Sequence, residues 1–284
     1  MKLHVNPDEI RILSDYIHKI SGIFLDINKG YLIETRLNTL AQEEGCSSFF
    51  HLYMKAKNDS SKNIERKIID RMTTNETLFF RDMSPFEMFQ YKIIPELIDR
   101  RSVVSAGSLP THLRIWSAAC STGQEVYSIA MVLKEMLRDI GKYNIRLLGT
   151  DISDAAIARA SYGHYNRFEI DRGLEKKFLN KYFKDEGNRW KIRDDIRAMA
   201  TFKKINLMDS FSGLGKFDVI FCRNVAIYFT PEDRNKLFEK IAHIMEPDGY
   251  LIIGSTESLT GVSPQFVPQR HLRSVFYRLK KRGG

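Results

Sequence analysis

Apolar residues recur every three or four positions through residues 1–100, a spacing that places them on one face of successive α-helices. Asn6 and Glu9 form the pattern of a capping box around Pro7, so a helix is expected to begin there, and Gly22 can end it. Pro95 is expected to kink or delimit the last helix of this part. The further helices are expected over residues 29–44, 49–57, 62–72 and 85–101.

After a linker at residues 102–112 the pattern changes to short apolar runs that alternate with amphipathic helical segments. Strands are expected at residues 113–118, 145–151, 216–224 and 249–255, with helices at 123–140, 154–163 and 230–245. This alternation predicts an α/β fold with a doubly wound parallel sheet. Right-handed crossovers then bring the carboxyl ends of the strands to one edge, where ligands bind.

Residues 163–203 interrupt the alternation. They contain a helical run and short strand-like pieces, at 174–183, 189–192 and 200–205. This predicts a small antiparallel β insertion, and the last apolar run, 274–281, predicts an antiparallel edge strand. The expected organisation is an N-terminal helical domain at residues 1–83 and a second domain at residues 84–284 that carries the insertion at about 163–203.

The composition fits a globular protein, with 43% hydrophobic and 28% charged residues among 284. No apolar run approaches the roughly 20 residues of a membrane helix, so no membrane insertion is expected. Cys46, Cys120 and Cys222 are far apart and lack metal-ligand spacing. Isolated cysteines and the absence of a signal-peptide pattern predict a cytoplasmic protein that binds no metal.

The net charge of +9 is unevenly distributed. Residues 159–204 carry 13 Lys and Arg against 7 Asp and Glu, and residues 266–284 carry 6 against none. One interpretation is an ordinary solvated surface. The other is a face for an acidic partner, which would be nucleic acid, an acidic protein or an anionic membrane.

A loop of small residues, Ser117–Gly123 ("SAACSTG"), follows the first predicted strand and lets a ligand approach the backbone closely. Asp151 ends the second strand, where a carboxylate can accept both hydroxyls of a ribose. The alternative is a helix N-cap, a role that Asp154 or Ser153 could fill equally well. The loop lacks phosphate-binding glycines and a Walker lysine. These features favour an adenosine ligand without phosphates, S-adenosylmethionine. Glu125 could meet its ammonium group, or could simply be a first-turn carboxylate favoured by the helix dipole.

The strand at residues 216–224 is expected to present Arg223, Asn224 and Tyr228 to the same edge. The run Asn/Asp-Pro-Pro-Tyr, which would indicate methylation of an amino nitrogen, is absent there. Asn206 is a candidate contact for the adenine end of the ligand, and a turn asparagine is an equally good interpretation.

Six segments give the chain a resemblance to a known family. They are "MTTNETLFFRD", "IWSAACSTGQEVYSIAM", "GTDIS", "INL", "FDVIFCRNVAIYF" and "PDGYLIIGSTESL". In combination and in this order they resemble the chemotaxis receptor methyltransferases of the CheR type. The resemblance implies a Rossmann-like class I S-adenosylmethionine-dependent methyltransferase domain. It also implies methyl transfer to glutamate side chains of the cytoplasmic signalling helices of chemotaxis receptors, which gives methyl esters and S-adenosylhomocysteine.

The resemblance also implies roles for individual residues. Arg81 and Tyr228 match the pair that acts near the transferring methyl group. The helical domain is expected to contribute Asn75, Thr77 and Arg81 to the cofactor pocket, and so to cover it. The remaining cofactor contacts match Ala119, Glu125, Asp151, Asn206, Leu207, Asn224 and Val225.

The chain departs from the family in two places. The second helix keeps Arg36 but has Thr39, Leu40 and Gln42 where family members often carry arginines that face the receptor. Basic residues on the next helices could substitute: Lys55, Lys57, Lys62, Arg66, Lys67 and Arg71. The insertion has a short turn, so no dependence on a receptor C-terminal pentapeptide tether is expected.

Two other functions stay open on the sequence. One is a nucleic-acid methyltransferase that uses the basic insertion and tail, although the site lacks a cysteine pair and an amino-methylation motif. The other is a non-catalytic module that binds S-adenosylmethionine. We expect receptor methylation and no nucleic-acid partner.

Overall fold

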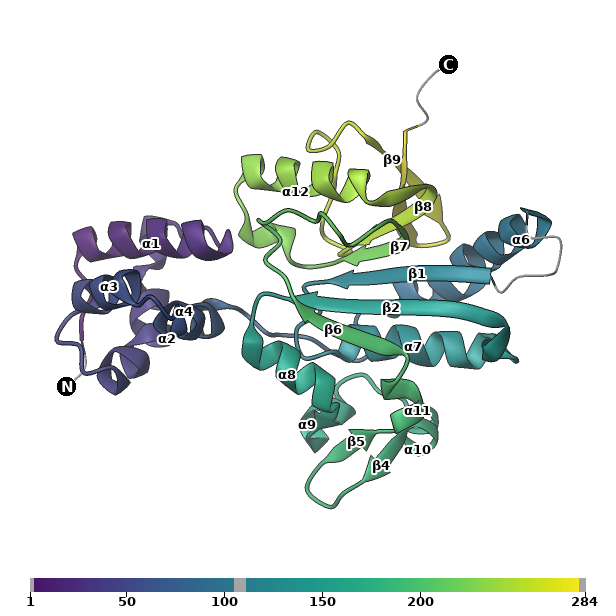
Figure 1. Ribbon diagram of the computed structural model, residues 1–284, viewed down its shortest axis with the longest axis horizontal. Helices are drawn as coiled ribbons and strands as arrows, with labels where there is room; N and C mark the ends of the chain where they lie inside the picture. The colour runs from purple at the N-terminus through teal and green to yellow at the C-terminus, as the bar shows by residue number, and fades with distance from the viewer. Residues whose placement is uncertain (1–2, 105–110, 281–284) are drawn as a thin grey trace.

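Residues 3–104 and 111–280 are described by a computed structural model (Figure 1). Its centre is a seven-stranded sheet in the order β6-β2-β1-β7-β8-β10-β9. The first five strands of this order are parallel, and β10 and β9 are antiparallel to their neighbours. The strands are β1 (Thr111–Ala118), β2 (Tyr143–Asp151), β6 (Ala200–Lys204), β7 (Phe217–Cys222), β8 (Met245–Ile253), β9 (Phe266–His271) and β10 (Ser274–Leu279).

Alternate residues of the central strands face two different cores, as the two-residue period of a strand requires. Ile115 and Val219 belong to the core covered by α7 (Gln124–Met136) and by the helices before β1. Trp116 and Ile220 belong to the opposite core, covered by α12 (Pro231–His243). The sheet is therefore buried on both faces, which confirms the predicted doubly wound α/β class.

The N-terminal helices form a bundle with its own apolar core, built around residues such as Leu13, Ile33 and Phe49. The capping box of Asn6 and Glu9 is present, and Gly22 ends the first helix in a left-handed conformation. The helical elements are α1 (Pro7–Ser21), η1 (Ile27–Lys29), α2 (Gly30–Glu43), α3 (Phe49–Asn58) and α4 (Asn63–Met72).

The segment between residues 83 and 104 is helical but interrupted. It consists of α5 (Met83–Met88), a π-helical turn η2 (Phe89–Ile93) and α6 (Ile94–Val104). Pro95 has no amide hydrogen to donate to the preceding turn, and the wider turn directly before α6 accommodates it. Part of the predicted linker, residues 105–110, lies outside the described residues, as do 281–284 of the basic tail.

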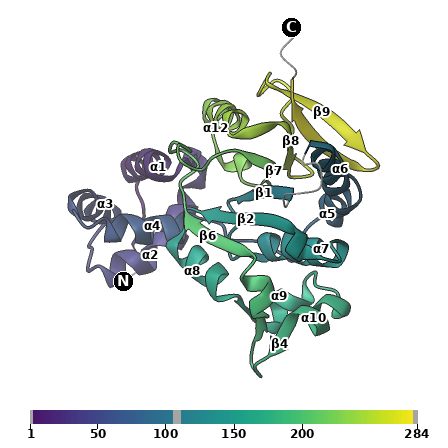
Figure 2. The same cartoon turned by 45° about the vertical axis from the view of Figure 1, so that its right-hand side comes forward.

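The insertion forms a separate three-stranded antiparallel sheet in the order β3-β5-β4, which lies on the opposite side of the main sheet from α12 (Figure 2). Its strands are β3 (His164–Tyr165), β4 (Phe183–Asp185) and β5 (Trp190–Ile192). The accompanying helices are α8 (Asp154–Tyr162), α9 (Arg167–Asp171), α10 (Lys176–Tyr182) and α11 (Asp194–Arg197). The predicted insertion is therefore present.

Two strand predictions were wrong in detail. The piece at 200–205 was expected in the insertion, but β6 pairs in parallel with β2 in the main sheet. The run at 274–281 was expected at the sheet edge, but β9 lies outside β10. The edge prediction failed because β9 buries few side chains, so its apolar pattern is weak. The strand at 200–205 was placed wrongly because the apolar pattern of a strand does not identify the strand with which it pairs. The division at residue 83 stays a prediction.

Candidate functional site

A cleft lies between the N-terminal bundle and the carboxyl ends of the parallel strands, and encloses about 1290 Å³ including the part open to solvent. Its walls come from the end of α1, from α2, from the segment between α4 and α5, and from the loops after β1, β2, β6 and β7. The cleft brings together every site residue predicted from the sequence. They are Asn75, Thr77, Arg81, Ala119, Glu125, Asp151, Asn206, Leu207, Asn224, Val225 and Tyr228.

The small-residue loop after β1 has the tight backbone that its composition predicts. Ala119 and Ser121 are left-handed, with φ of 58° and 51°, and the N–H of Cys120 donates to the carbonyl of Thr150 at 2.8 Å. Gly123 has a φ of 94°, and a Cβ there would lie 3.2 Å from the backbone of Ala160. The loop therefore passes close to the end of β2 and to α8, and glycine is required where it enters α7.

Asp151 is buried beneath this loop. Its Oδ2 accepts the N–H of Ser121 at 2.8 Å and its Oδ1 accepts the N–H of Ser153 at 3.0 Å. Burial raises the pKa of this carboxyl, and the two N–H bonds oppose the rise. Ser153, and not Asp151, caps α8, because its Oγ accepts the N–H of Ala156. Of the two interpretations of Asp151, the helix cap is thus excluded.

Glu125 and Arg223 form an ion pair at the end of the cleft. Arg223 Nη1 donates to Glu125 Oε2 at 2.9 Å, and Ser117 Oγ donates to Glu125 Oε1 at 2.8 Å. Arg223 Nη2 also donates to Asp82 Oδ2 at 2.9 Å and to the carbonyl of Arg81 at 2.7 Å. Only 2% of the Arg223 side chain is exposed. The buried guanidinium of Arg223 therefore forms ion pairs with two carboxylates, Glu125 on α7 and Asp82 directly before α5.

The sequence indicated that Arg223 is presented at the strand end but gave it no role. The available signal was its place directly before Asn224 at the end of a predominantly apolar strand. Its partner Asp82 is 141 positions away in the chain, and no pattern in the sequence pairs the two residues.

Arg81 lies between two left-handed residues, Phe80 with a φ of 50° and Asp82 with a φ of 55°. Its Nη1 donates to the carbonyl of Glu76 at 3.0 Å, and the side chain is half-buried in the cleft wall. Such backbone conformations are costly for non-glycine residues and persist where surrounding contacts hold them. The segment therefore fixes the backbone from which Arg81 reaches the cleft wall.

Asn206 and Tyr228 line the cleft and also join it to the N-terminal bundle. The amide of Asn206 donates to the carbonyl of Ile20 at 3.0 Å and accepts the N–H of Met208 at 2.9 Å. The carbonyl of Tyr228 accepts the N–H of Phe24 at 2.8 Å. The polar atoms of the Asn206 side chain thus stabilise the turn after β6 and join it to the end of α1, as the interpretation of Asn206 as a turn residue predicts.

The donor set fits S-adenosylmethionine. Asp151 offers an acceptor for ribose hydroxyls, and the trio of Glu125, Arg223 and Asp82 carries one net negative charge, which suits an ammonium group. Leu207 and Val225 add apolar surface for an adenine ring. The described residues include no group of three or more His, Cys, Asp or Glu that could hold a metal ion.

We expect Arg223→Met to lower the free energy of unfolding by about 3–5 kcal/mol, because removal of the buried cation leaves Glu125 and Asp82 uncompensated. Urea unfolding measures the change. Arg167→Met is the matched control, since the Arg167 side chain is 88% exposed and its ion pair with Asp171 is worth little. Equal stability of the two variants would contradict this account of Arg223.

Comparison with known proteins agrees with the architecture. The family model described as "CheR methyltransferase, SAM binding domain" matches residues 75–273, and "CheR methyltransferase, all-alpha domain" matches residues 8–73. A glycopeptide N-methyltransferase, MtfA complexed with sinefungin, is only distantly similar in structure. It has a TM-score of 0.32 and 13% identity over 55% of this chain and 47% of that chain, so this likeness carries no argument.

Chemotaxis methyltransferases are much more similar in sequence. Chemotaxis protein methyltransferase Cher2 of Pseudomonas putida is 37% identical over 269 residues, which cover 93% of this chain and 95% of that protein. Chemotaxis protein methyltransferase of Vibrio parahaemolyticus is 37% identical over 279 residues, or 97% and 98% of the two chains. That of Borreliella burgdorferi is 36% identical over 267 residues, or 92% of each. The chain belongs to the CheR methyltransferase family, and it is an S-adenosylmethionine-dependent methyltransferase of chemotaxis.

Proposed function

We propose that the protein transfers the methyl group of S-adenosylmethionine to glutamate side-chain carboxylates on the cytoplasmic signalling helices of chemotaxis receptors. The products are glutamyl methyl esters and S-adenosylhomocysteine. The observation that carries the proposal is Arg81, whose guanidinium a strained segment presents in a cleft that also receives Tyr228. An arginine can hold a carboxylate by paired hydrogen bonds without giving up its proton.

The chemistry requires little from the protein beyond placement. When bound, S-adenosylmethionine supplies an electrophilic methyl group, and its sulfur keeps the electron pair of the broken bond. A glutamate side chain, with a pKa near 4.3, is already ionised at neutral pH, so no general base is required. Arg81 aligns the carboxylate oxygen, and the surrounding cleft strips water from it. If Arg81 bound the glutamate carboxylate too tightly before the reaction, methyl transfer would become slower. The main role of Arg81 is therefore to orient the carboxylate and not to neutralise its charge.

We assign the remaining cleft residues supporting roles in this reaction. Tyr228 shapes the pocket or donates a hydrogen bond near the transferring methyl group. Asp151 accepts the ribose hydroxyls, and Glu125, already compensated by Arg223, meets the ammonium group. The other cofactor contacts are Asn75, Thr77, Ala119, Asn206, Leu207, Asn224 and Val225.

Two observations weigh against a nucleic-acid substrate. Ten of the thirteen Lys and Arg residues at positions 159–204 form ion pairs with Asp or Glu, so much of the positive charge of the insertion is already paired within the protein. Burial raises the pKa of the Cys120 and Cys222 thiols well above the usual value, so neither is a ready nucleophile for ring methylation.

We place the activity in the cytoplasm, because the proposed substrate helices are cytoplasmic. Among the residues that the structure describes, no helix combines the length and hydropathy needed to span a bilayer.

Asp151→Asn should weaken S-adenosylmethionine binding about ten- to a hundredfold, because a charged acceptor of hydrogen bonds is lost. Wild-type affinity should also fall as the pH is lowered through the raised pKa of Asp151, since protonation removes the acceptor that binding uses. Titration calorimetry at several pH values measures both effects. Asp154→Asn, at an exposed ion pair with Lys204, is the control. The same pH profile in wild type and Asp151→Asn would contradict the role of Asp151.

We propose that receptor methylation does not depend on a C-terminal pentapeptide tether. Only residues 186–189 separate β4 from β5, and the N–H of Glu186 donates to the carbonyl of Arg189 at 2.9 Å, which closes a tight turn. Truncation of the pentapeptide from a receptor should therefore leave the KM for that receptor unchanged. Measurable heat on titration of the free pentapeptide into the protein would contradict the proposal.

The proposed reaction predicts a base-labile product. Methyl-labelled S-adenosylmethionine and cytoplasmic receptor fragments from the same cell should give label that alkali releases as volatile methanol, because carboxyl methyl esters hydrolyse and N-methyl groups do not. Arg81→Ala should abolish most of this label. Arg172→Ala, at an exposed ion pair with Glu76 beside the same segment, should retain it. Label that resists alkali, or appears only on RNA, would refute the proposed function.

A further inference from the structure

Four large apolar side chains stand exposed beside the cleft. Phe24 is 52% exposed, Ile27 61%, Tyr31 63% and Ile227 52%. Phe24 and Tyr228 belong to the cleft wall, and the hydrogen bond between the Phe24 N–H and the Tyr228 carbonyl brings Ile227 next to Phe24 in space. Ile27 and Tyr31 are four positions apart across η1 and the start of α2, so they lie one helical turn apart. We call these four residues the apolar rim.

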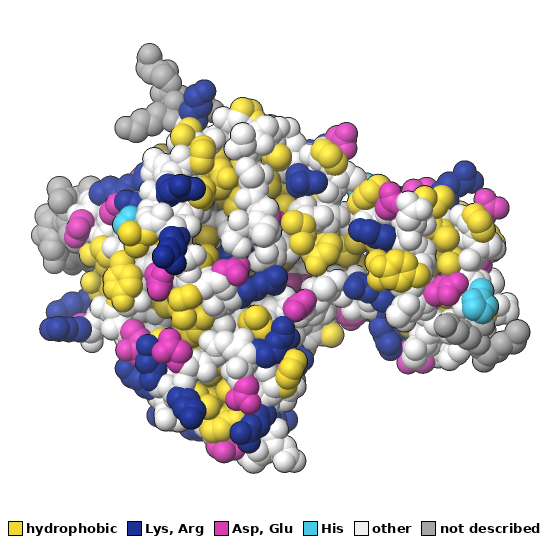
Figure 3. All heavy atoms as spheres, turned by 180° about the vertical axis from the view of Figure 1, so that it is seen from behind, with side chains coloured by type: hydrophobic (Ala, Val, Ile, Leu, Met, Phe, Trp, Pro, Cys, Tyr) yellow, Lys and Arg dark blue, Asp and Glu magenta, His cyan; other side chains and the backbone are white. Residues whose placement is uncertain are grey.

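Isolated exposed apolar residues are ordinary, but an apolar group beside a binding cleft marks an interaction surface. Aromatic side chains are enriched at such surfaces. The rim also adjoins cations, because Lys29 and Arg36 line the same cleft. Seen from behind, hydrophobic side chains alternate with Lys and Arg side chains on the part of the N-terminal bundle nearest the rest of the molecule (Figure 3).

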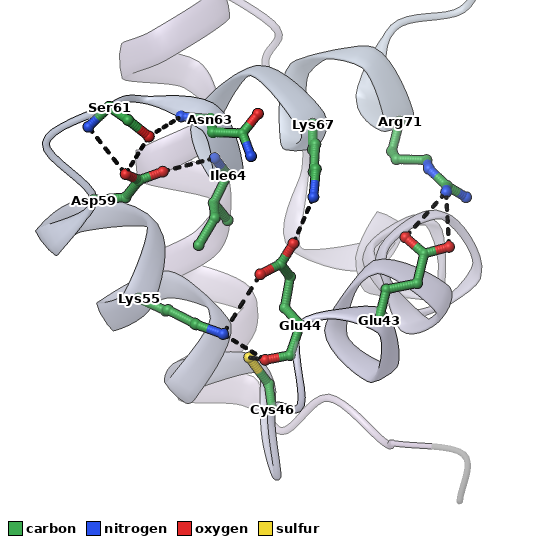
Figure 4. Close-up of polar contacts among 10 residues, drawn as sticks. All are labelled: Glu43, Glu44, Cys46, Lys55, Asp59, Ser61, Asn63, Ile64, Lys67 and Arg71. Atoms are coloured by element: carbon green, nitrogen blue, oxygen red, sulfur yellow. Dashed lines mark hydrogen bonds and ion pairs between the residues drawn. The ribbon is translucent and has the colours of Figure 1, made fainter.

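The basic residues of the later helices are poor alternatives for docking, because the bundle already compensates most of them. Lys67 and Lys55 both contact Glu44, at 2.7 and 3.4 Å, and Arg71 contacts Glu43 at 3.3 Å (Figure 4). The pairing with Lys67 lowers the pKa of Glu44. Lys62 contacts Glu65 at 3.1 Å. An acidic partner that docked on this surface would have to compete with these carboxylates.

The exposed stripe of α2 is also uncharged beyond Tyr31. Thr35, Thr39 and Gln42 follow it on the solvent side, and Thr35 Oγ1 donates to the carbonyl of Tyr31 at 2.7 Å. This part of α2 therefore offers a partner apolar and neutral polar contacts, and the cations adjacent to it face the cleft.

We infer that the apolar rim binds the substrate helix through apolar side chains that lie one turn before and after the glutamate that enters the cleft. The inference rests on the proposed function and specifies how that substrate is held. On a helix, residues three or four positions apart are neighbours on one face, so a glutamate inside the cleft brings such side chains to its rim. The glutamate carboxylate meets the cations of the cleft wall, and the apolar neighbours cover Ile27 and Tyr31.

The test compares KM values for cytoplasmic receptor fragments. Ile27→Ser with Tyr31→Ser should raise the receptor KM about tenfold, which corresponds to about 1.4 kcal/mol. Affinity for S-adenosylmethionine, measured by calorimetry, should stay unchanged, because neither residue lines the cleft. The effect should be similar at low and high salt, since apolar contact is not screened.

Two controls separate docking from general damage. Ile27→Leu with Tyr31→Phe keeps the apolar surface and should keep the wild-type KM. Tyr91→Ser removes an aromatic side chain that is 69% exposed outside the cleft wall, and should also leave KM unchanged.

Each outcome decides the inference. If the wild type forms receptor esters and the serine double variant keeps its KM, or if Tyr91→Ser raises KM equally, the apolar rim is not the docking site. If the wild type is a dimer that the double variant converts to monomers without a change in KM, the rim is a self-association surface and the inference is overturned. If the wild type forms no receptor ester, the proposed function fails, and this inference fails with it.

Discussion

The buried guanidinium of Arg223 is the constraint on which the site depends. A cation with 2% of its side chain exposed is stable only when carboxylates and carbonyls surround it. Its partners are Glu125 at the start of α7, Asp82 before α5 and the carbonyl of Arg81. The end of β7, the first turn of α7 and the segment that carries Arg81 must therefore meet at one point. The charge that remains on this group, one net negative unit, is then available to a cationic ligand.

Strain in the backbone is concentrated around the same cleft. Of the seven non-glycine residues with left-handed φ in the described part of the chain, five lie in its wall or directly beside Arg81: Phe80, Asp82, Ala119, Ser121 and Asn224. Such conformations cost about 1–3 kcal/mol each. Side-chain acceptors bind the backbone N–H groups of three of these residues: Ser128 Oγ binds that of Phe80, Asp151 that of Ser121 and Glu257 that of Asn224. The site is thus prearranged by contacts within the protein.

The sequence predicted those parts of the molecule whose signals are local. The capping box of Asn6 and the alternation of apolar strands and helices were sufficient for the bundle and the doubly wound sheet. Asp151 was found because a parallel strand ends there. The strand β9 was missed because Pro268 and exposed polar residues hide its pattern. The pairing of Arg223 with Asp82 was missed because it joins residues that only the tertiary fold brings together.

The position of the N-terminal bundle follows from three contacts at the end of α1 and one glycine in a left-handed conformation. His18 pairs with Asp233 at 2.7 Å. The side-chain amide of Asn206 donates a hydrogen bond to the carbonyl of Ile20, and the N–H of Phe24 donates one to the carbonyl of Tyr228. Between them Gly22 has a φ of 77°, and a Cβ there would lie 2.7 Å from Met208 Cγ. Because Tyr228 also lines the cleft, its location depends directly on where α1 ends. The helical bundle is therefore a wall of the cleft, whereas the segment that presents Arg81 is anchored in the sheet-bearing part, because Phe79 and Phe80 pack into the core beneath α7.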